Sequence, residues 1–77
     1  MEKLKNRPLS TVQTGQTVRM VRAEAGRGLN SRLASMGLVP NTEITVVSDG
    51  QRGTFVISVK GSRMMLGRGM ANKIIVS

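Results

Sequence analysis

Apolar and polar residues alternate over several short segments of this chain, with the two-residue period that is typical of half-buried β-strands. In the first such segment Val18 and Met20 fall on one face and Arg19 on the other. The alternation fails at Val21, which indicates a bulge or a strongly twisted strand. The whole pattern predicts strands over residues 17–23, 43–48, 54–60, 62–66 and 73–76.

A different period marks one helix in the middle of the chain. Leu29, Leu33 and Met36 are spaced i, i+4 and i+7, which places them in one apolar stripe on a helix of about two to three turns, and Arg32 lies on another side.

Two shorter helical features are expected beside the strands. Leu9 and Val12 indicate one helical turn or an extended clip, and residues 67–71 indicate a single helical turn.

Residues 33–47 contain the end of this helix, a turn and the start of the next strand, with almost no residues between them. Gly37 follows the apolar stripe and is a usual helix stop, and Pro40 cannot continue the helix. Pro40 and Asn41 set a turn, so the strand begins near Glu43. The helix must therefore connect directly to the β-structure.

Glycine-containing turns separate the strands. Asp49-Gly50 and Gly53 predict one hairpin, and Lys60-Gly61 predicts the next. The turn residues expected to be structural are Gly15, Gly37, Pro40 and Gly61. Short strands, tight turns and one inserted short α-helix predict a mainly β fold, a small SH3-like barrel of about five strands. The expected core is Val18, Met20, Leu33, Leu38, Ile44, Val46, Phe55, Ile57, Val59, Met64, Leu66, Ile74 and Val76.

Length and composition exclude several classes of function. The 77 residues allow one domain, expected over residues 9–77 behind a flexible basic lead-in over residues 1–8. The chain has no Cys and no His, which removes thiolate metal sites and the commonest general base and disfavours an enzyme. No apolar run approaches the roughly 20 residues that cross a bilayer, so a cytosolic location is expected.

The formal net charge of +8 favours an anionic partner: nucleic acid, an acidic protein face or an inner-leaflet surface. The alternative is that this charge only keeps a small domain soluble. The only aromatic residue, Phe55, is turned inward by the strand alternation, whereas single-strand binders stack bases on exposed aromatic side chains. Nucleic-acid binding is therefore disfavoured.

The residues that could bind a metal or an anion are few. The four carboxylates, at Glu2, Glu24, Glu43 and Asp49, are dispersed, so the sequence predicts no metal site and no cofactor. Six methionines could suggest a soft-metal site, but Met20, Met64 and Met70 are better explained as flexible core filler. Gly26-Arg27-Gly28 precedes the helix, where anions bind, yet without a phosphate-binding motif a plain loop is favoured.

The surface remains as the candidate functional region. Met65 and Val56 fall on the outward phase of their strands, with arginines 27, 32 and 63 as a possible rim. Exposed apolar groups ringed by Arg are typical of protein interfaces, although they could be stray surface residues. The candidate partner-binding residues are Arg27, Leu29, Asn30, Arg32, Leu33 and Met65.

Several segments along the chain also resemble the sequence pattern of a known protein family. The matching segments are Leu9-Ser10, Gly15-Gln16, Arg32-Leu33, Met36-Gly37-Leu38-Val39-Pro40, Ile44-Thr45-Val46-Val47, Lys60-Gly61 and Met70-Ala71-Asn72-Lys73-Ile74-Ile75-Val76. In this order they resemble the FeoA proteins of bacterial ferrous iron uptake. The "MGL-P" turn with its valine-rich strand is the most specific piece.

The resemblance implies an SH3-like barrel in the cytosol that serves as a non-enzymatic accessory to the FeoB-type membrane permease and is recruited to the inner face of the membrane without inserting into it. The same fold occurs as a C-terminal domain of iron- or manganese-dependent repressors, and the free-standing FeoA version is the expected match here. The alternative is a free-standing relative of that repressor domain, which would dock on a peptide. Three positions depart from the family pattern: Asn41 in place of Gly, a shortened loop over residues 48–53, and Gly67-Arg68-Gly69 in place of a more charged stretch.

Overall fold

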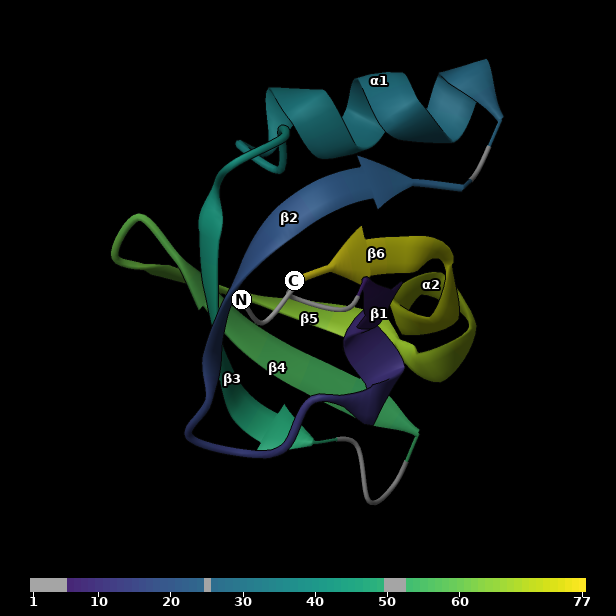
Figure 1. Ribbon diagram of the computed structural model, residues 1–77. Coiled ribbons are helices and arrows are strands. Elements are labelled where there is room, and N and C mark those ends of the chain that lie inside the picture. Colours follow the sequence, from purple (N-terminus) through teal and green to yellow (C-terminus); the bar gives the residue numbers. More distant parts are fainter. Residues whose placement is uncertain (1–5, 25, 50–52) are drawn as a thin grey trace, which may run out of the picture.

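The computed structural model describes residues 6–24, 26–49 and 53–77, with side chains for all of these except Arg27 and Leu29. The chain folds into one curled antiparallel sheet with two short α-helices (Figure 1). Its elements are β1 (Arg7–Pro8), η1 (Leu9–Thr11), β2 (Thr17–Ala23), α1 (Arg27–Ser35), β3 (Glu43–Asp49), β4 (Thr54–Val59), β5 (Ser62–Gly67), α2 (Arg68–Lys73) and β6 (Ile74–Val76).

The sheet has six strands in the order β1-β6-β2-β3-β4-β5. Its centre is β2, whose first half pairs with β3 and whose second half pairs with β6. The register shifts between Met20 and Arg22, which confirms the irregularity predicted at Val21. A bulge at this point bends the strand and lets one strand serve both halves of the sheet.

The expected strands are all present, with ends that differ by a residue or two. The main differences lie outside the periodic segments. Arg7 and Pro8 form β1 by pairing with Val76 and Ile75, so the flexible lead-in predicted to reach residue 8 is wrong at these two positions. This two-residue strand also brings the count to six rather than about five. The tip of the β3–β4 hairpin, residues 50–52, lies outside the described residues.

The core lies inside the curled sheet. Every residue predicted to be buried is buried except Met64, which is half-buried and packs against the core. The sequence analysis missed four further core residues: Leu9, Val12, Ala71 and Ile75. Leu9 and Val12 belong to η1 and the loop after it, where no period reveals which side chains point inward. There Ser10 Oγ donates a hydrogen bond to Asn72 Oδ1, which ties η1 to α2.

Helix α1 ends in a Schellman motif. Gly37 has a φ of 91° and donates its N–H to the carbonyl of Ala34 over 3.0 Å, while the Leu38 N–H reaches the carbonyl of Leu33 over 2.9 Å. This pair of bonds satisfies carbonyls that a helix end leaves open, and the motif is usually accompanied by an apolar contact between its two ends. Here those two ends, Leu33 and Leu38, are both buried.

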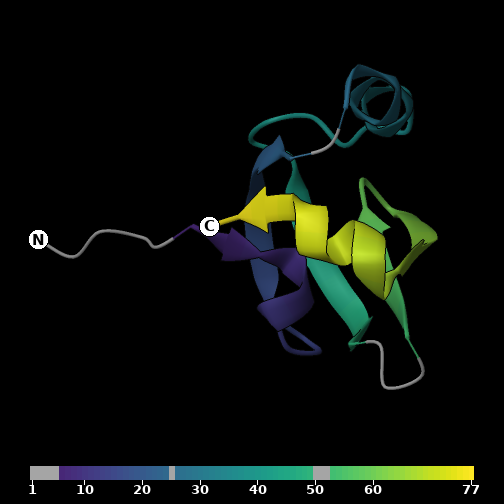
Figure 2. The same ribbon diagram turned by 90° about the vertical axis from the view of Figure 1, so that its right-hand side faces the viewer.

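Met36 departs from its predicted role. It was expected in the buried stripe of the helix, but it caps α1 as the first residue past the last turn, and it is 44% exposed. Among the α1 side chains that the structure describes, Leu33 is the one that is buried. Figure 2 shows α1 end-on and set apart from the strands, whereas α2 runs directly into β6.

The remaining turn predictions agree with the backbone. Positive φ angles occur at Gly15, Gly37, Gly53 and Gly61, and also at Asn41, with φ 75°, and at Lys60. Asn41 therefore takes the left-handed conformation that Gly would take at this position. Pro40 lies in the same turn.

Replacement of Phe55 by Ala should lower the free energy of unfolding by about 3–5 kcal/mol, because truncation of a large core aromatic leaves a cavity. Phe55 is fully buried. Chemical denaturation monitored by circular dichroism measures the difference. A variant as stable as the parent would contradict the inward register of β4.

A pair of glycine substitutions should change stability in opposite directions. Gly37→Ala should destabilise by about 1–2 kcal/mol, because its left-handed backbone is strained for a residue with a Cβ. Gly28→Ala is the matched control: Gly28 lies within α1 with ordinary φ and open space around it, so Ala should stabilise the helix by up to about 1 kcal/mol. Equal effects of the two changes would show that the Schellman motif does not define the helix end.

Candidate functional site

A groove of about 220 Å³ lies where α1, β5 and α2 meet. We call it the methionine groove, because three of the residues that line it are methionines. The lining residues are Arg32, Leu33, Met36, Met65, Leu66, Gly67 and Met70. Thioether side chains are flexible and polarisable, so such a lining adapts to apolar groups of different shape.

Each element places its methionine in the groove for a local reason. On β5 the alternation turns Leu66 into the core and Met65 outward, where it is 73% exposed. Met36 enters the groove because α1 ends just before it. Met70 lies on α2 and is half-buried against the core. The prediction that Met70 fills the core is thus only partly correct, since it also lines the groove.

The structure brings together half of the predicted partner-binding residues. Arg32, Leu33 and Met65 line the same groove. Leu33 is only 1% exposed, so its side chain belongs chiefly to the core, and its role as a partner contact stays a prediction. Asn30 lines a different hollow. The side chains of Arg27 and Leu29 lie outside the described residues.

The second hollow, of about 320 Å³, lies on the β2 side of α1. It is lined by Met20, Arg22, Ala23, Asn30, Ala34, Leu38, Val39 and Pro40. Val39 is partly exposed there, but Met20 and Leu38 are buried. Helix α1 therefore separates two hollows, and the one toward β5 holds the more exposed apolar side chains.

The three elements that form the methionine groove carry positive charge, and Arg32 lines the groove itself. The sequences of α1, β5 and α2 contain no Asp or Glu. They contribute the exposed residues Arg32, Arg63 and Arg68. The guanidinium of Arg68 lies 5.5 Å from the centre of the Phe55 ring, within the range of a cation–π contact. This face is therefore cationic and apolar together.

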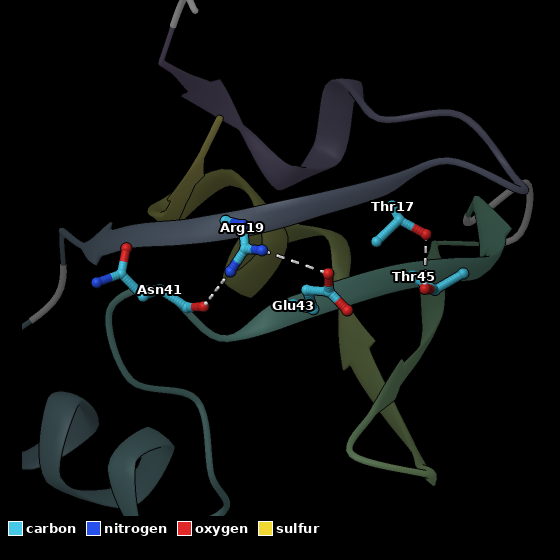
Figure 3. A network of polar contacts seen from close by, with 5 residues as sticks. All are labelled: Thr17, Arg19, Asn41, Glu43 and Thr45. Atoms are coloured by element: carbon cyan, nitrogen blue, oxygen red, sulfur yellow. Dashed lines mark hydrogen bonds and ion pairs between the residues drawn. The ribbon is translucent and has the colours of Figure 1, made fainter.

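The β2–β3 face differs, because its arginines are paired with carboxylates. Figure 3 shows Arg19, which lies 3.5 Å from Glu43 and donates a hydrogen bond to the carbonyl of Asn41 over 3.2 Å. Arg22 pairs with Glu24 over 2.9 Å. These exposed pairs contribute little to stability. Their effect is on charge distribution: they neutralise β2 and leave the excess positive charge on other faces.

In the part of the chain that the structure describes, no three acidic, His or Cys side chains gather as a metal site would need. Across the same residues, every buried side-chain nitrogen or oxygen has a hydrogen-bond partner. None of the described helices is long and apolar enough to cross a membrane.

The sequence analysis missed Met36 and Met70 as groove residues. Both fit an apolar period, which predicts burial. The available signal was positional: Met36 directly precedes the helix stop at Gly37, so it lies past the last helical turn, where the helical period no longer predicts which side chains are buried. Met70 carried no such signal, because its exposure depends on how α2 sits beside β5.

Comparison with known proteins agrees with this fold. A protein of Methanocaldococcus jannaschii named "Putative Fe(2+) transport protein A" is 39% identical over 69 residues, which are 90% of this chain and 83% of that protein. A crystal structure of the iron uptake regulatory protein FeoA is 34% identical, with a TM-score of 0.85 over 96% of this chain and 97% of the other. A manganese-dependent transcriptional repressor is 19% identical, with a TM-score of 0.86 over 97% of this chain and 42% of its own.

The repressor likeness shows the fold alone, at that level of identity. Together with the FeoA structure it confirms the SH3-like fold predicted from the strand pattern. The family model described as "FeoA domain" matches residues 7–77, a range that includes all six strands and both α-helices. The chain therefore belongs to the FeoA family.

Proposed function

We propose that this protein is a non-enzymatic accessory of ferrous iron uptake that binds the cytosolic face of a FeoB-type permease and modulates its assembly or nucleotide cycle. Family membership and the Fe(2+) transport named for its M. jannaschii relative support the iron-uptake part. The single structural observation that supports a binding role is the methionine groove, with Arg32 in its lining.

The exposed apolar side chains of the groove favour a protein partner. Met65 at 73% and Met36 at 44% are among the few large apolar residues on the described surface. Methionine and arginine are both enriched at the centres of protein interfaces. The apolar surface of a side chain as exposed as Met65 is removed from water only when a partner covers it. That removal contributes favourably to the free energy of complex formation.

A nucleic-acid-associated barrel is the weaker alternative. The net charge of +8 would suit it, but the only aromatic side chain, Phe55, is fully buried and cannot stack on a base. The protein acts in the cytoplasm in this proposal, recruited to the inner membrane face through the permease rather than by insertion of its own chain.

Joint replacement of Arg27 and Arg32 by Glu should weaken binding to the cytosolic region of the permease by at least about tenfold, or about 1.4 kcal/mol. Arg32 lines the groove, and Arg27 begins the same helix. Stability should change by only about 0.5 kcal/mol, since both are surface changes. Surface plasmon resonance with the immobilised permease region measures the affinity.

The matched control is the double variant Arg7→Glu, Lys60→Glu, which makes the same change in net charge at β1 and at the β4–β5 turn. It should bind within about twofold of the parent if the site is local. Equal loss in both double variants would mean that only net charge matters. Full binding and full ferrous uptake by the helix variant in a deletion strain would place the interface elsewhere.

The isolated protein should bind Fe²⁺ no more tightly than about millimolar, because the chain has no His or Cys ligand and only four carboxylates. Anaerobic isothermal titration calorimetry checks this expectation. A stoichiometric site of micromolar affinity, about −8 kcal/mol, would contradict an accessory that acts without holding iron.

A further inference from the structure

The last strand in the sheet order is β5, which pairs with β4 on one side and with none of the described strands on the other. It runs for six residues beside the methionine groove and contributes Met65, Leu66 and Gly67 to the groove lining. Unpaired backbone groups along such an edge can pair with an added strand. The free edge and the groove are therefore parts of one continuous surface.

We propose that this surface binds an extended acidic segment of the permease, which adds as a strand beside β5, inserts one apolar side chain into the methionine groove and places carboxylates against Arg32 and Arg63. This inference rests on the proposed function in taking the segment from the permease. The chemistry of the segment is argued independently, from the size, charge and edge geometry of the site.

The size of the groove fits a single side chain. At about 220 Å³ it is smaller than the roughly 300–1,000 Å³ typical of small-molecule sites. Its floor is the fully packed pair Leu33 and Leu66, so it does not continue into the core. The flexible side chains of Met36, Met65 and Met70 surround this floor and can close around an aliphatic or aromatic anchor.

The charge selects an acidic segment. Carboxylates are absent from α1, β5 and α2. Of the three described carboxylates, Glu24 and Glu43 are engaged with β2 arginines on another face, and Asp49 lies at the end of β3. A basic segment beside β5 would meet Arg32 and Arg63 without compensation. An acidic one would form pairs at the rim, where charge chiefly sets specificity and association rate.

The same charge disfavours a second copy of this chain as the occupant. Two β5 strands paired edge to edge would bring together two cationic faces, each with Arg63 on the strand itself. Charged residues on an edge strand are a common protection against self-pairing. Arg63 therefore disfavours pairing of β5 with a second copy of the chain, but it does not disfavour pairing with a segment of negative charge.

The probe for the test is a synthetic eight-residue peptide that alternates Thr and Glu, with one central Leu in place of a Glu. Leu and the carboxylates then share one face of the added strand, as Met65 and Arg63 share one face of β5. It should bind the ¹⁵N-labelled protein, shift the amide resonances of β5 and the groove, and slow hydrogen exchange along β5. The same peptide with Lys in place of Glu should bind at least about tenfold more weakly. Methylation of alternate backbone nitrogens should abolish the exchange protection.

Variants locate the binding. Arg32→Glu and Met65→Glu should each weaken peptide binding by at least about tenfold. Arg7→Glu, which lies on the opposite end strand β1, should change it by less than about twofold. Equal binding of the acidic and basic peptides, or equal binding by Met65→Glu and the parent, would overturn the inference. So would a protein dimer, seen by sedimentation, that Met65→Glu dissolves, because the occupant would then be a second copy.

The outcome also separates this inference from the proposed function. If the permease region binds the protein but Met65→Glu does not weaken that complex, the inference fails and the accessory role stands. If the acidic peptide binds as expected but the permease region does not, the chemistry of the groove stands and the accessory role fails. Loss of both interactions in Met65→Glu, with retention of both in Arg7→Glu, supports the two together.

Discussion

The junction between α1 and β3 is the constraint on which the functional surface depends. Gly37 reverses the chain, and the buried side chain of Thr42 locks the reversal by donating a hydrogen bond to the Gly37 carbonyl over 3.1 Å and accepting one from the Val39 N–H over 3.3 Å. The backbone of Thr42 in turn accepts a bond from Met20 on β2 over 2.9 Å. One short connection therefore fixes the helix to the sheet.

This junction explains how so small a helix can hold a groove in place. A nine-residue helix is marginal in water by itself. Among the α1 side chains that the structure describes, Leu33 is the buried one, and it anchors the C-terminal end of the helix beside the Schellman motif. The helix is held at that end and stands apart from the sheet, which leaves a hollow on each side. A helix packed flat on the strands would have covered the methionines instead.

The spacing of apolar residues predicted most of the strands and the core, but it predicted less about which side chains form the groove on the surface. Alternation identifies Phe55, Ile57 and Val59 as core because strands expose one face and bury the other. It cannot identify β1 or the inward turn of Leu9, since a two-residue strand and a 3-10 turn have no measurable period. Nor can it show that Met36 and Met70 meet Met65, because that contact depends on three elements packing at one corner.

The fold alone does not determine the function, because the same architecture occurs in a protein named as a manganese-dependent repressor. What distinguishes this chain is the combination of surface features that its own sequence creates. Ion pairs neutralise the arginines of β2, while α1, β5 and α2 carry cations without acids. The positive charge of these three elements coincides with the exposed methionines and with the edge strand β5. Each feature alone is common on small proteins, but their combination on one face supports the proposal of an extended acidic ligand.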